Sequence, residues 1–363
     1  MRRFVPIRWL VVIVFTSSLL FAQSTLPAAT VAKIDQIVEK ARTDQKLPAV
    51  SVAIELKGNV IFRKAYGFAD LENNVAATPD TLIRTGSIAK PMTAVGAMQL
   101  VEQGKLDLDA PIQKYCPEFP QKKWPITTRE LLGHESGIRA YEGKEAESTV
   151  HYSSTADGMI FFKNDPLLFQ PGEKFAYTTY GYTVIGCVME GASGQKYPDY
   201  MAQHVFKPAG MTHSFVDNFA ILPHRARGYE KDDNGNVQNA GPMDSSYKIP
   251  GGGYVSSSED LVRFADAVLN NRLLKADSVK TMWTSLKTSD GKETHYGLGW
   301  GLADLEGIRI FAHTGGQQGT STSLIAMPSR DYASAVMINM QHIDAAQINR
   351  DITSVVIEAM KLK

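Results

Sequence analysis

Strand-like segments occur near both ends of this chain, and a long helical block separates them. Residues 49–69 contain two β-rich runs joined at Lys57-Gly58-Asn59, a pattern typical of a hairpin. From about 88 to 285 the pattern is mostly helical, and strand-like runs return after about residue 295. We therefore expect an α+β fold in which both termini build one antiparallel sheet, with helices packed on it or inserted.

The helical segments divide this expected domain into two lobes. The clearest helical runs are 92–103, 128–133, 181–191, 197–206 and 258–270, and the run AAQINRDITSVVIEAM closes the chain. Serines and acidic residues precede the apolar positions of 258–270, which is typical of a helix N-terminus. We expect one domain over residues 23–363, with a mostly helical lobe at about 88–285.

The first residues have the order of a secretory signal. Arg2, Arg3 and Arg8 precede an apolar run at 9–21, and the small residue Ala22 suits a cleavage site. We expect residues 1–22 to be a signal peptide and the protein to be exported, to the periplasm or outside the cell. The alternative is a retained membrane anchor, which would also allow transient membrane contact.

Charge and cysteine content exclude several functions. The chain of 363 residues has 38 Lys and Arg against 38 Asp and Glu, so no global field favours nucleic acid. Cys116 lies in an irregular stretch, whereas Cys187 lies in an apolar helical pattern that predicts a buried thiol. Because no CxxC, HExxH or acidic cluster is present, we expect no metal site, and nothing implies a cofactor.

Serine hydrolases need a base for the hydroxyl, an acid for the leaving group and N–H donors for the oxyanion. The α/β-hydrolase solution needs a GxSxG elbow, and the strings GHESG and GTSTS do not match it. The Ser-Lys solution needs S-x-x-K, a weak motif by itself. It occurs three times, as Ser87/Lys90, Ser193/Lys196 and Ser245/Lys248.

Sequence context favours the first pair. Ser193 lies where a helix ends, and Ser245 lies in a turn-rich loop with no helix to set its spacing to a lysine. Ser87 follows Gly86 and begins a long apolar helix, so Lys90 at i+3 shares its face and can reach the hydroxyl. The helix N-terminus favours negative charge, and burial would lower the pKa of the amine. The alternative is an N-cap serine with an exposed lysine.

Two further segments could complete such a site. Tyr177 is expected on a loop just before a helix, where its phenol could act as an acid or base. The string His313-Thr314-Gly315-Gly316 is expected at a strand end, where glycines let the backbone approach a substrate and expose an N–H. Taken singly, Tyr177 is more often a packing aromatic and HTGG more often a turn. Their occurrence in this order supports the site.

These motifs resemble the serine β-lactamase and penicillin-binding protein family, in its class C-like branch (peptidase family S12). That branch has S-x-x-K, Y-x-N and K-T-G, and this chain has SIAK, YTT and HTG. The strings ITTRELLGHESGI, PGGGYVSSSEDLVRF and YGLGW support the resemblance, which spans nearly all of the mature chain. The pattern is most similar to the mitochondrial serine β-lactamase-like peptidases of animals. The resemblance implies the β-lactamase/transpeptidase-like fold.

The resemblance also implies roles for individual residues. Ser87 would be the acylated nucleophile, Lys90 its base, and Tyr177 the proton shuttle to the leaving group. The N–H groups of Ser87 and Gly316 would form the oxyanion hole. The residues expected to bind substrate are Thr179, His313, Thr314 and Gly315.

Two positions depart from the family pattern. Thr179 replaces an asparagine, and His313 replaces a lysine that is a permanent cation. If His313 faces the substrate with its ordinary pKa of about 6.5, carboxylate-bearing peptides should bind better as pH falls. The alternative is a histidine that only packs at the strand end.

We therefore expect an exported serine hydrolase that forms an acyl-enzyme on Ser87 and cleaves peptide or amide bonds. The enzyme alternatives are an esterase, a class C-like β-lactamase or a D-alanyl-D-alanine carboxypeptidase. The non-enzyme alternative is an inactive module that binds peptidoglycan or a protein. The expected partner is a small peptide, amide or ester, and the sequence leaves the oligomeric state open.

Overall fold

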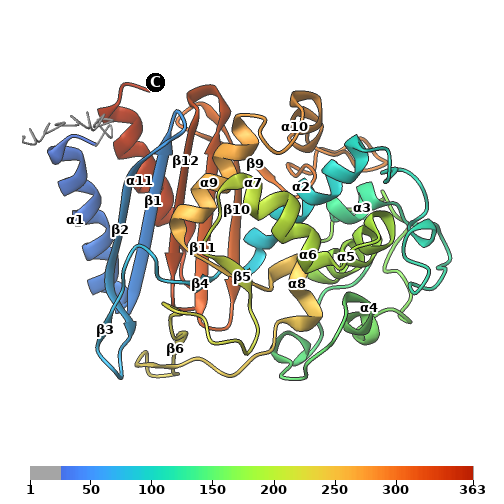
Figure 1. Ribbon diagram of the computed structural model, residues 1–363, viewed down its shortest axis with the longest axis horizontal. Helices are drawn as coiled ribbons and strands as arrows, with labels where there is room; N and C mark the ends of the chain where they lie inside the picture. The colour runs from blue at the N-terminus through green and yellow to red at the C-terminus, as the bar shows by residue number, and fades with distance from the viewer. Residues whose placement is uncertain (1–25, 363) are drawn as a thin grey trace, which may run out of the picture.

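The computed structural model describes residues 26–362 (Figure 1). The expected signal peptide at 1–22 therefore lies outside the described residues. Among the helices of residues 26–362, none combines the length and the apolar character that a membrane crossing requires.

A seven-stranded antiparallel sheet forms the centre of the fold. Its strand order is β3-β2-β1-β12-β11-β10-β9, so strands from the two ends of the chain meet at the β1–β12 pair. In that pair Val50 lies opposite Ile338. The expectation of one sheet built from both termini is confirmed. The strands are β1 (Ala49–Leu56), β2 (Asn59–Asp70), β3 (Val75–Ala76), β9 (Gly301–Leu305), β10 (Ile308–Gln317), β11 (Thr320–Met327) and β12 (Tyr332–Ile338).

The predicted hairpin joins β1 and β2 through two residues. Lys57 and Gly58 have φ angles of 53° and 76°, and Leu56 lies opposite Asn59. Positive φ at both turn residues gives the twist that suits a two-residue hairpin, which explains the glycine.

Helices cover both faces of the sheet. Helices α1 (Ala28–Gln45) and α11 (Ala345–Ala359) pack together on one face, at the left of Figure 1. Helix α9 (Ser258–Leu269) packs on β1, β11 and β12 from the other face, and the Ser257 side chain accepts a hydrogen bond from Asp260 N as the predicted N-cap. Because water reaches neither face, β1, β11 and β12 are buried at every residue.

The helical lobe lies beside the sheet, to the right in Figure 1. Its central helix α2 is buried at nearly every position, which explains its apolar sequence. Apart from α9, the α-helices of residues 86–285 are α2 (Ala89–Glu102), α3 (Thr128–Leu132), α4 (Thr155–Gly158), α5 (Thr179–Ser193), α6 (Tyr197–Met201) with a π turn at Ala202–Phe206, α7 (Lys207–Ala209), α8 (Ile249–Gly252) and α10 (Ala276–Met282). Of these, α5, α6, α8 and α10 contact α2.

Short strands that the sequence did not predict lie in this lobe and just before it. Strands β4 (Ile83–Arg84), β8 (Tyr254–Ser256) and β5 (Ser214–Val216) form a small sheet, and β6 (Tyr229–Lys231) pairs with β7 (Val237–Asn239). Strands of two or three residues are too short to show an alternating pattern, so only the tertiary structure reveals them.

The two cysteines form a disulfide, which corrects the expectation that Cys187 is a free thiol. Cys116 and Cys187 are 71 residues apart in sequence, and their Cα atoms lie 5.4 Å apart. Helix α5 approaches the chain around Cys116 closely, because a Cβ on Gly191 would lie only 1.7 Å from the Tyr115 carbonyl oxygen. Such a long-range contact leaves no local signal in the sequence.

Removing this disulfide should destabilise the protein. Cross-linking residues so far apart restricts the unfolded chain, so Cys116→Ser/Cys187→Ser should lower the free energy of unfolding by about 2–4 kcal/mol. Urea unfolding of both proteins, with and without reductant, measures the difference. Reductant should shift the wild-type midpoint toward that of the double variant and leave the variant unchanged. Equal midpoints for both proteins, with and without reductant, would show that the disulfide does not stabilise the fold.

Candidate active site

Ser87 lies in a 3₁₀ turn, Gly86–Ile88, immediately before α2. The residues before it are anchored to the large sheet: Thr322 Oγ1 donates to Thr85 O at 2.8 Å, and Thr320 Oγ1 donates to Arg84 O at 2.9 Å. The sheet therefore fixes the position of the serine, although the serine belongs to the helical lobe.

The backbone around Ser87 lies directly against the end of β10. Gly86 has a φ of 51°, and a Cβ there would lie 2.7 Å from Gly316 N. A Cβ on Gly315 would lie 2.1 Å from Thr85 O and 3.0 Å from Ser87 N. Both positions require glycine because side chains would separate the two segments. The backbone nitrogens of Ser87 and Gly316 are thereby brought near one another, as a two-donor oxyanion site requires.

Lys90 is fully buried beneath Ser87. Its Nζ lies 2.9 Å from Ser87 Oγ, 3.1 Å from Thr179 Oγ1 and 2.9 Å from Gly251 O. Among the described residues, no carboxylate lies within ion-pair distance of this amine. Burial, and then the positive charge of Lys248, hold the pKa of Lys90 well below its ordinary value.

These three contacts suit a neutral amine acting as a base. Two N–H groups can donate to Gly251 O and Thr179 Oγ1, which leaves the nitrogen lone pair for the Ser87 hydroxyl proton. The reach of Lys90 to Ser87, expected from the i, i+3 spacing, is confirmed, and the alternative with an exposed lysine is wrong. Thr179 keeps a contact with the lysine despite lacking an amide.

Tyr177 precedes α5, as expected, and its ring faces Lys90, whose Nζ lies 4.8 Å from the ring centroid. The residue is 41% exposed, yet burial around the hydroxyl raises the pKa of Tyr177, opposed by a hydrogen bond with Ser87. The phenol therefore retains its proton at neutral pH. Of the two groups beside Ser87, the amine can accept a proton and the phenol can donate one.

His313 differs from its expected behaviour. It is buried, its Nε2 lies 2.9 Å from the Tyr296 hydroxyl, and its Nδ1 lies 2.6 Å from Thr314 O. Since a carbonyl only accepts, Nδ1–H donates to Thr314 O and Nε2 accepts from Tyr296. Burial and the charge of Lys90 lower the pKa of His313 to about 3. The expectation of an ordinary pKa is therefore wrong, because the buried ring is held neutral by its two hydrogen bonds. Carboxylate binding that strengthens as the pH falls toward 6.5 is no longer expected from this residue.

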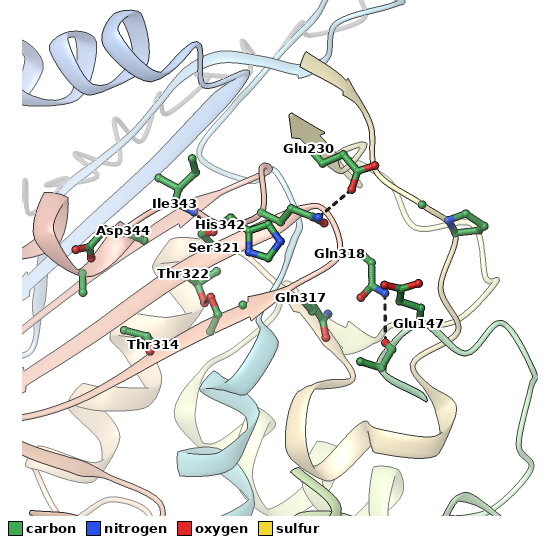
Figure 2. A pocket seen from close by; sticks show the side chains of 18 of the residues that line it. Glu147, Glu230, Thr314, Gln317, Gln318, Ser321, Thr322, His342, Ile343 and Asp344 are labelled. Atoms are coloured by element: carbon green, nitrogen blue, oxygen red, sulfur yellow. Dashed lines mark hydrogen bonds between the residues drawn. The ribbon is translucent and has the colours of Figure 1, made fainter. Parts of the chain in front are cut away.

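Two open cavities meet at Thr314 and Gly316. One has a volume of about 530 Å³ and contains Ser87, Tyr177 and Tyr296. The other has a volume of about 870 Å³ and is lined by Thr314 and Thr322 of the large sheet and by Glu147 and by Glu230 of the short strand β6 (Figure 2). A substrate can therefore extend from Ser87 in two directions along β10.

Several residues of the site were not predicted. His134, with a φ of 61°, accepts from Thr178 N at 3.2 Å through Nδ1, and its ring centroid lies 4.2 Å from that of Tyr177. Gly251 and Tyr296 supply the other unpredicted contacts, to Lys90 and His313. The strings GHESG, PGGGYVSS and YGLGW contain these residues, but only their three-dimensional contacts show what they do.

The other two Ser-Lys pairs do not form such a site. Ser193 ends α5 and Lys196 is exposed, as expected. Ser245 donates to Asp217 Oδ2 at 2.8 Å and is buried, as is Lys248. The expectation of a turn-rich loop is wrong there, because residues 246–252 form a 3₁₀ turn followed by α8.

Comparison with known proteins agrees with this geometry. The sequence profile of the Beta-lactamase family matches residues 34–356. Serine beta-lactamase-like protein LACTB, mitochondrial, from Homo sapiens is 30% identical over 388 residues, covering 80% of this chain and 71% of that protein. The octameric penicillin-binding protein homologue from Pyrococcus abyssi has a TM-score of 0.80 at 26% identity, covering 90% of this chain and 77% of that one.

A further solved structure shows the same fold. D-amino acid amidase from Ochrobactrum anthropi SV3, complexed with D-phenylalanine, has a TM-score of 0.77 at 23% identity and covers 92% of this chain and 99% of that chain. The family profile, the human relative and the solved structures all cover most of the described residues. The chain therefore belongs to the Beta-lactamase family and is a serine hydrolase of that family.

Proposed function

We propose that this protein hydrolyses peptide or amide bonds through an acyl-enzyme on Ser87. The observation that supports it best is the buried Lys90 amine, 2.9 Å from Ser87 Oγ, in surroundings that lower its pKa. A lysine with an ordinary pKa would be protonated at neutral pH and could not accept the serine proton.

The proposed reaction has two halves, acylation and deacylation, and Lys90 is the base in both. Ser87 Oγ transfers its proton to Lys90 Nζ and attacks the substrate carbonyl carbon, whose oxygen is stabilised by the N–H groups of Ser87 and Gly316. The C–N bond breaks as Tyr177 donates a proton to the leaving nitrogen, and Lys90 returns a proton to Tyr177. Water then attacks the ester, its proton moves to Lys90, and Ser87 regains its proton as the acid is released.

The third motif favours amide substrates over penicillins in this proposal. His313 is neutral and hydrogen-bonded, so that position offers no fixed cation for the carboxylate that β-lactams bear. An amidase with the same fold supports this choice as an analogy. Esterase, β-lactamase and carboxypeptidase activity are the alternatives that substrate assays separate.

We also propose that the protein is exported. Residues 1–22 have the order of a signal peptide, and the Cys116–Cys187 disulfide suits an oxidising compartment.

If the protein is exported, its signal peptide should be removed and the mature chain should be shorter than the encoded one. Expressed in an exporting bacterial host, the mature protein should lose about the first 22 residues, because the small residue Ala22 follows the apolar run. Intact-mass measurement of periplasmic and membrane fractions tests this. A full-length mass in the membrane fraction would favour the retained anchor instead.

Ser87→Ala should abolish covalent labelling by a fluorophosphonate probe, because that substitution removes the attacking oxygen while a small side chain preserves the fold. Intact-mass measurement after exposure to the probe, and separately to a penicillin, shows which leaving groups are accepted. Ser193→Ala and Ser245→Ala are matched controls that should label like the wild type. Labelling of Ser87→Ala would mean that another residue is the nucleophile.

Tyr177→Phe should slow amide hydrolysis by about 100-fold or more, and hydrolysis of an activated ester much less. An amine leaves only with a proton, whereas a nitrophenolate leaves without one, so the lost hydroxyl affects the two substrates unequally. The measurement is kcat/KM for an amide and a nitrophenyl ester with the same acyl group. Equal losses would assign Tyr177 to positioning Lys90 instead.

A further inference from the structure

A second buried lysine lies beside the site and has no role in the proposed reaction. Lys248 is 4% exposed, and its Nζ contacts Met243 Sδ at 3.2 Å and Ala146 O at 3.5 Å. It also lies 5.2 Å from the ring centroid of Tyr247 and 5.7 Å from that of Tyr141. Within residues 26–362, no carboxylate lies within 4 Å of it. Burying an unpaired ammonium is costly, so an apolar residue would stabilise this position better.

The backbone that follows Lys248 directly contacts the catalytic base. Lys248 is the N-cap of α8, and Gly251, three residues later, accepts the hydrogen bond from Lys90 Nζ. Pro250 O also accepts from Thr93 Oγ1 at 2.6 Å, which fastens α8 to α2 one turn beyond Lys90. The separation of the two lysines is thus set by one short helix and two buried hydrogen bonds.

We propose that Lys248 is a positioning residue whose positive charge keeps the Lys90 amine free of a proton. The inference rests on the proposed function, in which Lys90 is the base. Two ammonium groups held in one buried region repel each other, so a proton on Lys248 opposes a second proton on Lys90. The effect adds to the burial of Lys90 and acts through space, without contact with the substrate.

The remaining charged and titratable groups around the two lysines do not cancel this effect. Facing Lys90 are Tyr177 and Tyr182, whose pKa values are raised, and His134 and His313, whose pKa values are lowered, so all four are neutral near pH 7. Near Lys248 are Arg84 and Asp217. Arg84 lowers the pKa of Lys248 and Asp217 raises it, but Asp217 pairs with Arg84 at 2.8 Å and with Arg225, and burial with Arg84 outweighs it.

The direction of the pH dependence follows from these groups. Burial and Arg84 lower the pKa of Lys248 to about 7, so Lys248 is protonated below that pH. Below that pH the charge on Lys248 opposes a proton on Lys90, whose pKa is already lowered by burial. Because the reaction needs neutral Lys90, the charge on Lys248 should extend activity to lower pH.

The test compares neutral and charged residues at position 248 in the full chain. In Lys248→Met the acid limb of kcat/KM should move to higher pH by roughly one unit, with the plateau above it largely retained. Lys248→Gln should show the same shift. Lys248→Arg, which retains the charge, should keep the wild-type limb, and Lys196→Met is the matched exposed control. The pH dependence of fluorophosphonate labelling at Ser87 gives a second readout that needs no natural substrate.

The outcomes separate this inference from the proposed function. If the wild type is not labelled at any pH, the acyl-enzyme on Ser87 is wrong. If the wild type is labelled and both neutral variants keep its acid limb, the role of Lys248 is wrong. A loss of rate that is equal at every pH, in Lys248→Met and Lys248→Arg alike, would also overturn it by showing that the side chain only packs.

Discussion

The pairing of β1 with β12 is the contact on which the rest of the structure depends. It joins a hairpin near the N-terminus to four strands from the C-terminal quarter, with Val50 opposite Ile338. Strand β10 is thereby held one strand away from β12, where Gly315 and Gly316 reach the turn that contains Ser87. The two expected oxyanion donors, Ser87 N and Gly316 N, come from segments more than 200 residues apart, so the site forms only when the sheet is assembled.

Burial of the groups beside Ser87 then determines which of them acts as the base and which as the acid. The same burial that lowers the pKa of Lys90 raises the pKa of Tyr177, because it disfavours the charged form of each group. Lys90 is charged when protonated, so burial favours its neutral amine, which can accept a proton. Tyr177 is charged when deprotonated, so burial favours its neutral phenol, which can donate one. No carboxylate within residues 26–362 pairs with Lys90 to reverse this effect.

His313, in the HTG string, stands where the family pattern has a lysine, and the site lacks a fixed cation at that position as a result. His313 is packed against Tyr296 and its own strand, so it shapes the wall of the site without offering a charge. Two cavities meet at Thr314 and Gly316, one bordered by tyrosines and the other by Glu147 and Glu230. A second buried lysine does lie in this region, namely Lys248, the N-cap of α8.

The sequence by itself determined the features that depend on near neighbours in the chain. The Lys57-Gly58 turn follows from local backbone geometry, the helical segments from periodicity, and the reach of Lys90 to Ser87 from a spacing of three residues. The motif around Tyr177 and the string HTGG were also recognisable, because each is a contiguous run of residues. The tertiary structure alone decided the Cys116–Cys187 disulfide, the neutral state of His313 and the burial of Lys248. Each of these depends on water exclusion or on contact with residues remote in the chain, and neither leaves a periodic trace in the sequence.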